Sequence, residues 1–290
     1  MIKETFAAVG HSARGLLRGW AGLALLHLLY AALLASAYWF FATGVATTGQ
    51  LVVSAVTFLL APLLFFVLQA AAAHFAAGAR GAGALLGRAL RDFWKMLLVS
   101  LPLVALGVGL VYLLNRLGGY LPKPDEAAAR VASSVGPRAL PPDPLHWPDA
   151  LSSSLWLLLL GFVLPLVAAH LWLSVARDGL KTTLRRFHRV AGRAFLPRPV
   201  LAYAVGLLVF GLMPYFIIFT RTPLKSAWGE LILFGLRLAL AFVFTLWGWV
   251  ITLGALNAVA PPATNDAAPA AGPPTPAPAE PVSAEPQPQT

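Results

Sequence analysis

Residues Leu151–Val175, LSSSLWLLLLGFVLPLVAAHLWLSV, run for about 25 positions without a charged side chain. At about 1.5 Å rise per residue, a helix of this length crosses the ~30 Å hydrocarbon core of a bilayer. The next stretch, Ala176–Arg198, carries one acid, Asp178, and seven basic residues. They are Arg177, Lys181, Arg185, Arg186, Arg189, Arg193 and Arg198. Because basic loops stay on the cytoplasmic side during insertion, this pair of segments predicts a membrane-spanning helix with its C-terminal end in the cytoplasm.

The composition of the whole chain agrees with a membrane protein. Its residues are 59% hydrophobic and 11% charged, whereas soluble domains carry roughly 25% charged residues. The net charge of +10 comes mainly from residues at the ends of apolar segments, where anionic lipid headgroups are the nearest partners. This distribution argues against nucleic acid as a partner. The chain has no cysteine, which excludes disulfides and thiolate chemistry.

Five further segments are long and apolar enough to span the membrane. With Leu151–Val175 the expected spans are 20–43, 51–75, 93–114, 151–175, 200–220 and 231–256. With the N-terminus inside, 14 Lys and Arg residues lie in cytoplasmic segments and 6 in outer ones. This asymmetry predicts an all-α, six-span, multi-pass protein of a bacterial inner membrane with both termini in the cytoplasm.

The first span has a second interpretation. Its basic flank, apolar core and Ala35-Ser36-Ala37 resemble a secretory signal with a small-residue cleavage site. The apolar run continues through residues 38–41, which a cleaved signal does not need, so an uncleaved anchor is favoured. The other spans keep the same topology in either case.

The chain divides into a membrane domain, residues 1–258, and a tail, residues 259–290. The tail is rich in proline and alanine and lacks Lys and Arg, so it is expected to be disordered in the cytoplasm. The outer loop, residues 116–150, holds many prolines and a short expected helix at Asp125–Val135.

Three basic stretches, residues 2–20, 80–96 and 181–198, each lead into an outward-going span. In each, an arginine precedes by six positions the aromatic residue that opens the span. The pairs are Arg14 with Trp20, Arg88 with Trp94, and Arg189 with Phe195. We expect three units, each an interfacial amphipathic helix followed by a transmembrane hairpin. The alternative is that any such span begins with a cation and a ring, because both suit the interface.

This pattern resembles the six-span membrane domain fused to bacterial glycerophosphodiester phosphodiesterases. The same three arginine and aromatic pairs carry the resemblance, which extends over most of residues 1–258. The resemblance implies a membrane domain of similar organisation. It implies no catalytic activity, because the soluble phosphodiesterase domain of those fusions is absent here.

Titratable residues give few candidates for chemistry. No Asp or Glu lies inside an expected span, which argues against an ion-coupled carrier. His27, His74 and His170 share the cytoplasmic half of the bilayer and are metal candidates. They lack the short spacing of a helical metal motif and have no carboxylate at hand as a base, so we expect interfacial histidines and no metal. In the outer loop, Asp143, His146 and Asp149 are read as solvated residues rather than as an acid–base group.

Apart from Lys95 at the edge of the third span, Arg237 is the one charged residue within an expected span, and Glu230 lies on the same helical face. Either Arg237 binds an anion or headgroup, or it snorkels to the interface or pairs with Glu230. The remaining headgroup candidates are basic residues of the cytoplasmic segment that follows the fourth span. They are Arg185, Arg186, Arg189 and Arg193.

No motif for a nucleotide, a metal or a nucleophile is present, so no cofactor is expected. We expect a non-catalytic membrane protein, a lipid-proximal scaffold or accessory subunit, with anionic lipids and a membrane protein as partners. A small-solute or lipid transporter is the first alternative, since Pro62, Pro102, Pro165 and Pro214 could break helices around a substrate site. A membrane-embedded enzyme is the second.

Overall fold

The computed structural model describes residues 2–44, 46–120, 147–220, 222 and 226–259. The chain separates into two units, Met1–Ala260 and Pro261–Thr290. The second unit lies outside the described residues, as do the helix expected at Asp125–Val135 and the outer-loop residues Asp143 and His146. The predictions made for these segments stay predictions.

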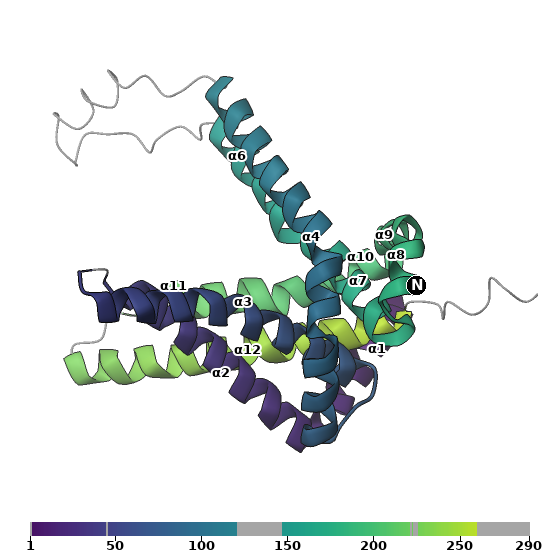
Figure 1. Ribbon diagram of the computed structural model, residues 1–290, viewed down its shortest axis with the longest axis horizontal. Coiled ribbons are helices and arrows are strands. Elements are labelled where there is room, and N and C mark those ends of the chain that lie inside the picture. The colour runs from purple at the N-terminus through teal and green to yellow at the C-terminus, as the bar shows by residue number, and fades with distance from the viewer. Residues whose placement is uncertain (1, 45, 121–146, 221, 223–225, 260–290) are drawn as a thin grey trace, which may run out of the picture. The chain divides into compact units, whose positions relative to one another are not determined.

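Every regular element among the described residues is helical (Figure 1). In chain order they are α1 (Ile2–Leu17), α2 (Trp20–Ala42), α3 (Thr48–Ala76), α4 (Ala82–Tyr120), α6 (Trp147–Trp156), the π-helical η1 (Leu157–Val163), α7 (Leu164–Asp178), α8 (Leu180–Arg185), α9 (Phe187–Ala194), α10 (Pro197–Leu207), the π-helical η2 (Leu208–Leu212), α11 (Met213–Phe219) and α12 (Ala227–Val259).

Six helical segments are long and apolar enough to cross a membrane, which confirms the all-α polytopic fold. They are Trp20–Ala42, Thr48–Ala76, Ala82–Gly119, Ala150–Asp178, Pro197–Phe219 and Ala227–Val259. The protein is a multi-pass membrane protein.

One boundary differs clearly from expectation, because α4 begins at Ala82 and not near Phe93. Residues 82–93 are mostly alanine, leucine and arginine, all good helix formers, so the lead-in continues into the span without a break. The other two lead-ins are separated from their spans. Gly19 has a non-helical backbone (φ −109°, ψ 49°) between α1 and α2, and Leu196 has an extended one (φ −64°, ψ 148°) before α10.

Two of the proline-containing spans change helix type just before the proline. In η1 the backbone N–H of Leu164 bonds to the carbonyl of Leu159, and Pro165 follows directly. A proline cannot donate to the carbonyl four residues earlier, here that of Gly161. The Tyr203 hydroxyl of α10 donates to this carbonyl at 3.4 Å. The freed acceptor thus becomes a contact between two spans, and η2 stands in the same position before Pro214.

The core lies where the C-terminal part of α3 meets α4, α7 and α12. Residues Ala70–Ala73 of α3 are fully buried, and their small side chains allow the neighbouring helices to come close. Gly248 of α12 serves the same purpose, since a Cβ there would lie 2.9 Å from the backbone nitrogen of Phe210. Small residues therefore mark the closest helix crossings.

Buried polar side chains join the spans in pairs. The indole N–H of Trp172 (α7) donates to Ser100 Oγ (α4) at 2.8 Å, and that of Trp249 (α12) donates to Gln69 Oε1 (α3) at 2.8 Å. Trp172 is buried in the core, where its N–H has a partner on a neighbouring span.

Candidate functional site at the basic end of the membrane unit

Four segments that are distant in sequence meet at one end of the helices, which we call the basic end. It consists of α1, the α3–α4 connection at residues 77–81, helices α8 and α9, and the last turns of α12. Helix α1 packs on α12, and α8 and α9 follow the end of α7, which Arg177 joins to Asn257 at the end of α12. Asn257 Nδ2 of α12 donates to the Ala76 carbonyl at the end of α3 (3.1 Å). The expected headgroup residues 185–193 lie at this end.

Helix α1 docks on α12 and α10 through one face. Thr5 and Leu16 are buried there, and Ser12 Oγ donates to the Ile251 carbonyl of α12 at 3.0 Å. At the start of α10, Arg198 forms an ion pair with Glu4 at 3.0 Å, and both side chains are largely exposed. The amphipathic lead-in therefore folds as a helix packed on the bundle.

The lead-in at residues 181–198 forms two short helices, whereas the spacing of its apolar residues predicts one. The break is at Arg186, whose backbone is non-helical (φ −110°, ψ 18°). Thr183 is buried and its Oγ donates to the Gly179 carbonyl at 2.9 Å. Leu184 is 47% exposed.

Exposed cations and exposed apolar side chains lie close in sequence on α8 and α9. Arg185 and Arg189 are exposed, Arg186 and Arg193 are half-buried, and Phe195 and Leu196 just beyond α9 are exposed. The aromatic residues that open the first two outward spans, Trp20 and Trp94, are exposed as well. Cations beside rings are the side chains that the headgroup region of a bilayer solvates best.

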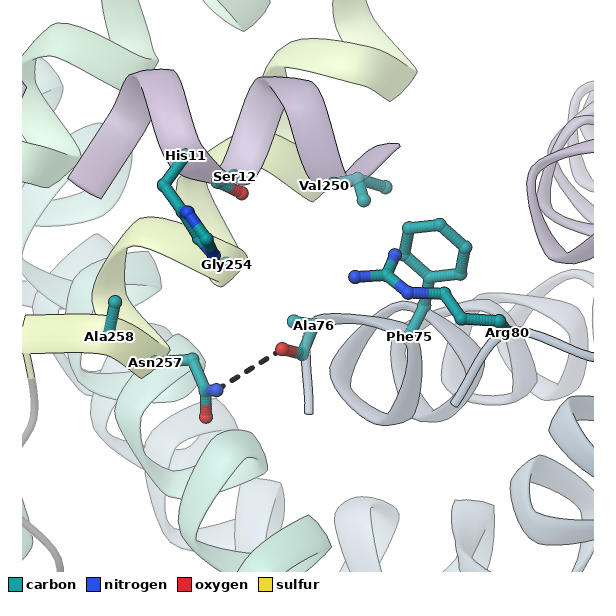
Figure 2. A pocket seen from close by; sticks show the side chains of 10 residues that line it. His11, Ser12, Phe75, Ala76, Arg80, Val250, Gly254, Asn257 and Ala258 are labelled. Carbon is teal, nitrogen blue, oxygen red and sulfur yellow. Dashed lines mark hydrogen bonds between the residues drawn. The ribbon is translucent and has the colours of Figure 1, made fainter. Parts of the chain in front are cut away.

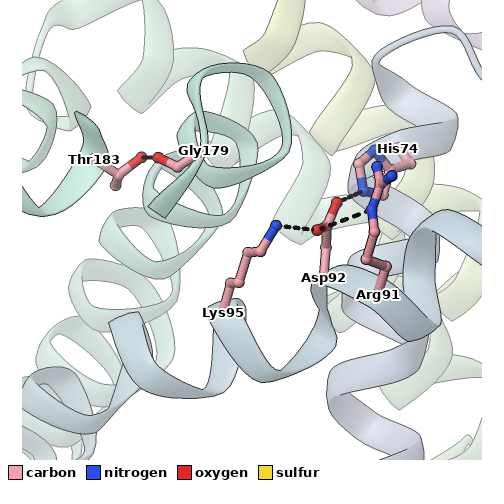
Figure 3. A network of polar contacts seen from close by, with 6 residues as sticks. All are labelled: His74, Arg91, Asp92, Lys95, Gly179 and Thr183. Carbon is pink, nitrogen blue, oxygen red and sulfur yellow. Dashed lines mark hydrogen bonds and ion pairs between the residues drawn. The ribbon is translucent and has the colours of Figure 1, made fainter. Parts of the chain in front are cut away.

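A buried ion-pair cluster joins α3 to α4 next to this surface (Figure 3). His74 Nε2 lies 2.9 Å from Asp92 Oδ2, and both side chains are less than one-tenth exposed. Lys95 Nζ bonds to the other carboxylate oxygen at 2.5 Å, and Arg91 Nε lies 3.7 Å from it. The expectation that His74 has no carboxylate at hand is wrong. Asp92 reaches it because α4 is already helical at residue 82 and packs along α3.

The three candidate metal ligands do not meet. His27 receives the indole N–H of Trp247 at Nε2 (3.1 Å), and His170 Nδ1 lies 2.9 Å from the Leu166 carbonyl of its own helix. His74 is committed to Asp92. Within the described ranges, no group of three His, Asp or Glu side chains has a geometry that could hold a metal ion.

Arg177 joins the C-terminal end of α7 to that of α12, a contact that its sequence position does not reveal. Its guanidinium donates to Asn257 Oδ1 (2.6 Å) and to the Asn257 carbonyl, while the Asn257 amide donates to Ala76. The C-terminal end of a helix carries partial negative charge and unpaired carbonyls, which a guanidinium satisfies. The C-terminal ends of α3, α7 and α12 are thus tied together by two side chains.

Arg237 lies at the other end of the unit, in the first half of α12. It is half-buried and donates to Thr222 Oγ1, in the connection that precedes α12. Its side chain therefore runs toward the N-terminal end of its helix, as the snorkelling alternative requires. Among the described contacts it forms no ion pair with Glu230. Whether it also binds an anion stays open as a prediction.

No protein family, characterised protein or solved structure matches this chain. The resemblance to the membrane domain of glycerophosphodiester phosphodiesterases therefore stays a prediction, and the site must be judged from its own geometry.

Proposed function

We propose that this chain is an integral protein of a bacterial inner membrane, with both termini in the cytoplasm, that acts without catalysis as a lipid-proximal scaffold or accessory subunit. The observation that carries the proposal is the composition of the basic end. Exposed Arg185 and Arg189 lie close in sequence to exposed Phe195 and Leu196, on short helices between two spans. Such a surface suits anionic phospholipid headgroups on the cytoplasmic side.

The basic lead-ins also support the cytoplasmic placement of this end. Lys and Arg gather beside the spans on the side that stays inside, and 14 of them belong to segments at this end by the expected topology. The six-span organisation led by three basic stretches is shared with the glycerophosphodiester phosphodiesterase membrane domain that the chain resembles. We include that relationship in the proposal.

Transport of a small solute or lipid is the second candidate, and one observation favours it. Asp92, His74 and Lys95 form a buried ionisable cluster at the edge of the membrane unit. Ionisable residues at membrane depth often mark substrate or proton pathways. A structural role in joining α3 to α4 accounts for the same cluster, because each polar atom of the carboxylate has a partner.

The proposal is tested by purifying the full chain from bacterial membranes in a mild detergent and identifying retained lipids and proteins. We expect anionic phospholipid to be enriched over zwitterionic phospholipid. Each basic residue near an anionic surface contributes about 1 kcal/mol, so Arg185→Gln with Arg189→Gln should weaken retention roughly thirtyfold. The matched double variant with Lys at both positions keeps the charges and should retain lipid. Equal lipid content in all three proteins would contradict the proposal.

A further inference from the structure

A small pocket opens at the basic end, on the side of α1 that faces the α3–α4 connection. Its volume is about 200 Å³, and residues of α1, of the end of α3 with the connection, and of the last turns of α12 line it. Figure 2 shows Arg80 and His11 reaching into the space above the Asn257 to Ala76 hydrogen bond. Among the described residues that line it, none is acidic.

No carboxylate of the described residues forms an ion pair with Arg80. Its guanidinium carbon lies 4.5 Å from the centre of the Phe75 ring, which is itself buried. A cation over an aromatic face is attracted by the ring quadrupole. Among the described residues, Arg80 forms no ion pair and its side chain forms no hydrogen bond. The stacking on Phe75 is therefore the contact that positions its guanidinium. Its five N–H donors are therefore available to a ligand.

Three glycines at the junction of α1 and α2 make room for the stacked pair. A Cβ at Gly15 would lie 3.2 Å from the Arg80 guanidinium, and one at Gly19 would lie 2.9 Å from the Phe75 ring and 3.0 Å from Arg80 Cδ. At Gly22 a Cβ would lie 2.9 Å from the Arg80 carbonyl. Side chains at Gly19 and Gly22 would crowd the Phe75 ring and the chain at Arg80, so the backbone of residues 15–22 forms a cradle around the stacked pair.

The other polar groups of the pocket are either donors or already occupied. His11 is exposed, and its imidazole carries at least one N–H donor in either protonation state. The Asn257 amide is committed to Ala76 and Arg177. The C-terminal end of α12 opposes an anion through its partial negative charge, but Arg177 donates to the carbonyl of Asn257 and offsets that charge.

We infer that Arg80 and His11 bind a phosphate-bearing anion in this pocket. A guanidinium presents paired N–H donors that match two phosphate oxygens. Pockets for drug-sized ligands measure roughly 300–1,000 Å³, so a pocket of about 200 Å³ suits a phosphate group with little attached to it. The phosphate belongs either to a phospholipid headgroup or to a soluble phosphate compound. The site goes beyond the proposed function, since it uses none of the exposed arginines of α8 and α9.

The test uses the full chain in mild detergent and two probes, inorganic phosphate and short-chain phosphatidylglycerol. Binding is measured by native mass spectrometry and by the rise in thermal midpoint. We expect Arg80→Gln to weaken binding of whichever probe the wild type binds at least tenfold, and His11→Ala to weaken it severalfold. Arg14→Gln is the matched control, because this exposed arginine of α1 does not line the pocket, and it should bind as the wild type does.

The probes also identify the source of the phosphate. Arg80-dependent binding of the lipid alone assigns a headgroup, and binding of inorganic phosphate alone assigns a soluble ligand. Binding of both, with mutual competition, assigns the shared phosphate chemistry. If Arg80→Gln does not fold, the exposed His11→Ala variant decides. Equal binding by wild type and the pocket variants, or binding of neither probe, would overturn the inference. That result would not contradict the separate proposal that the arginines of α8 and α9 bind anionic lipid.

Discussion

The two halves of α12 have nearly the same hydropathy and opposite environments. In its first half, Trp228 is 76% and Ile232 69% exposed, whereas Leu253 and Leu256 near its C-terminal end are fully buried. Helix α3 shows the same division in the same chain direction, with mostly exposed residues at 51–60 and buried ones at 67–75. The buried halves of both helices end at the basic end. The membrane unit therefore has a packed half beside the basic end and an exposed half away from it.

This contrast shows what packs helices in a bilayer. Large apolar side chains gain little from leaving lipid for protein, so they do not distinguish the two halves. Small and polar residues do. The packed half of α12 holds Gly248, Thr252, Gly254 and Asn257, and that of α3 holds Gln69, four alanines and His74. Close approach and interhelical hydrogen bonds define the core.

The largest effect is expected from the buried carboxylate of the packed half. Asp92→Ala leaves the buried His74 and the half-buried Lys95 without their partner, which should lower the free energy of unfolding by about 3–5 kcal/mol. Glu230→Ala, in the exposed first turn of α12, is the control and should cost less than about 1 kcal/mol. Thermal unfolding in detergent measures both. Equal losses would erase the distinction between the halves.

A glycine comparison within α12 should give the next largest effect. A Cβ at Gly248 would lie 2.9 Å from the backbone nitrogen of Phe210, whereas one at Gly235 would meet nothing within 4 Å. Gly248→Ala should therefore cost roughly 1–3 kcal/mol through overpacking. Gly235→Ala should be neutral or stabilising by up to about 1 kcal/mol. The yield of monodisperse protein and its thermal midpoint report the difference, and a harmless Gly248→Ala would show that the crossing is loose.

A smaller effect is expected at the tie between helix ends. Asn257→Ala removes the side-chain acceptor of Arg177, though not the backbone carbonyl, and removes the donor to Ala76, which should cost about 1–2 kcal/mol. Asn115 lies exposed near the far end of α4, so Asn115→Ala should change stability by less than about 0.5 kcal/mol. Proteolysis rates near the end of α12 provide a second readout. No change on Asn257→Ala would mean that the helix ends are held by apolar packing alone.

Span number and position could be predicted from the sequence, because a bilayer imposes length and polarity on each crossing. The position of the packed half could not be predicted, because hydropathy does not distinguish a side chain that faces lipid from one that is buried in protein. Asp92 illustrates the limit. It lies two residues before Trp94 in a basic stretch that is typical of the membrane interface. Its side chain is buried because α4 begins early and packs along α3.

The site was predicted in part. The basic residues at 185–193 were candidates from charge alone, whereas the two-helix form of that stretch depends on burial of Thr183 and a break at Arg186. Arg80 has no local feature that separates it from Arg88 or Arg91. Only the folded position of Gly15, Gly19 and Gly22 around it reveals the cradle.

The proposed function requires above all that the basic end face the cytoplasm. The chain has no cysteine, so single cysteines report their own positions. Gly83 and His188 are exposed at the basic end, and Thr48 and Ser226 at the other end; Thr183 is unsuitable because it is buried. In intact spheroplasts, a membrane-impermeant thiol reagent should label Thr48→Cys and Ser226→Cys but not Gly83→Cys or His188→Cys. All four should react after permeabilisation. Labelling of the two basic-end positions in intact spheroplasts, with protection of the other two, would contradict the account.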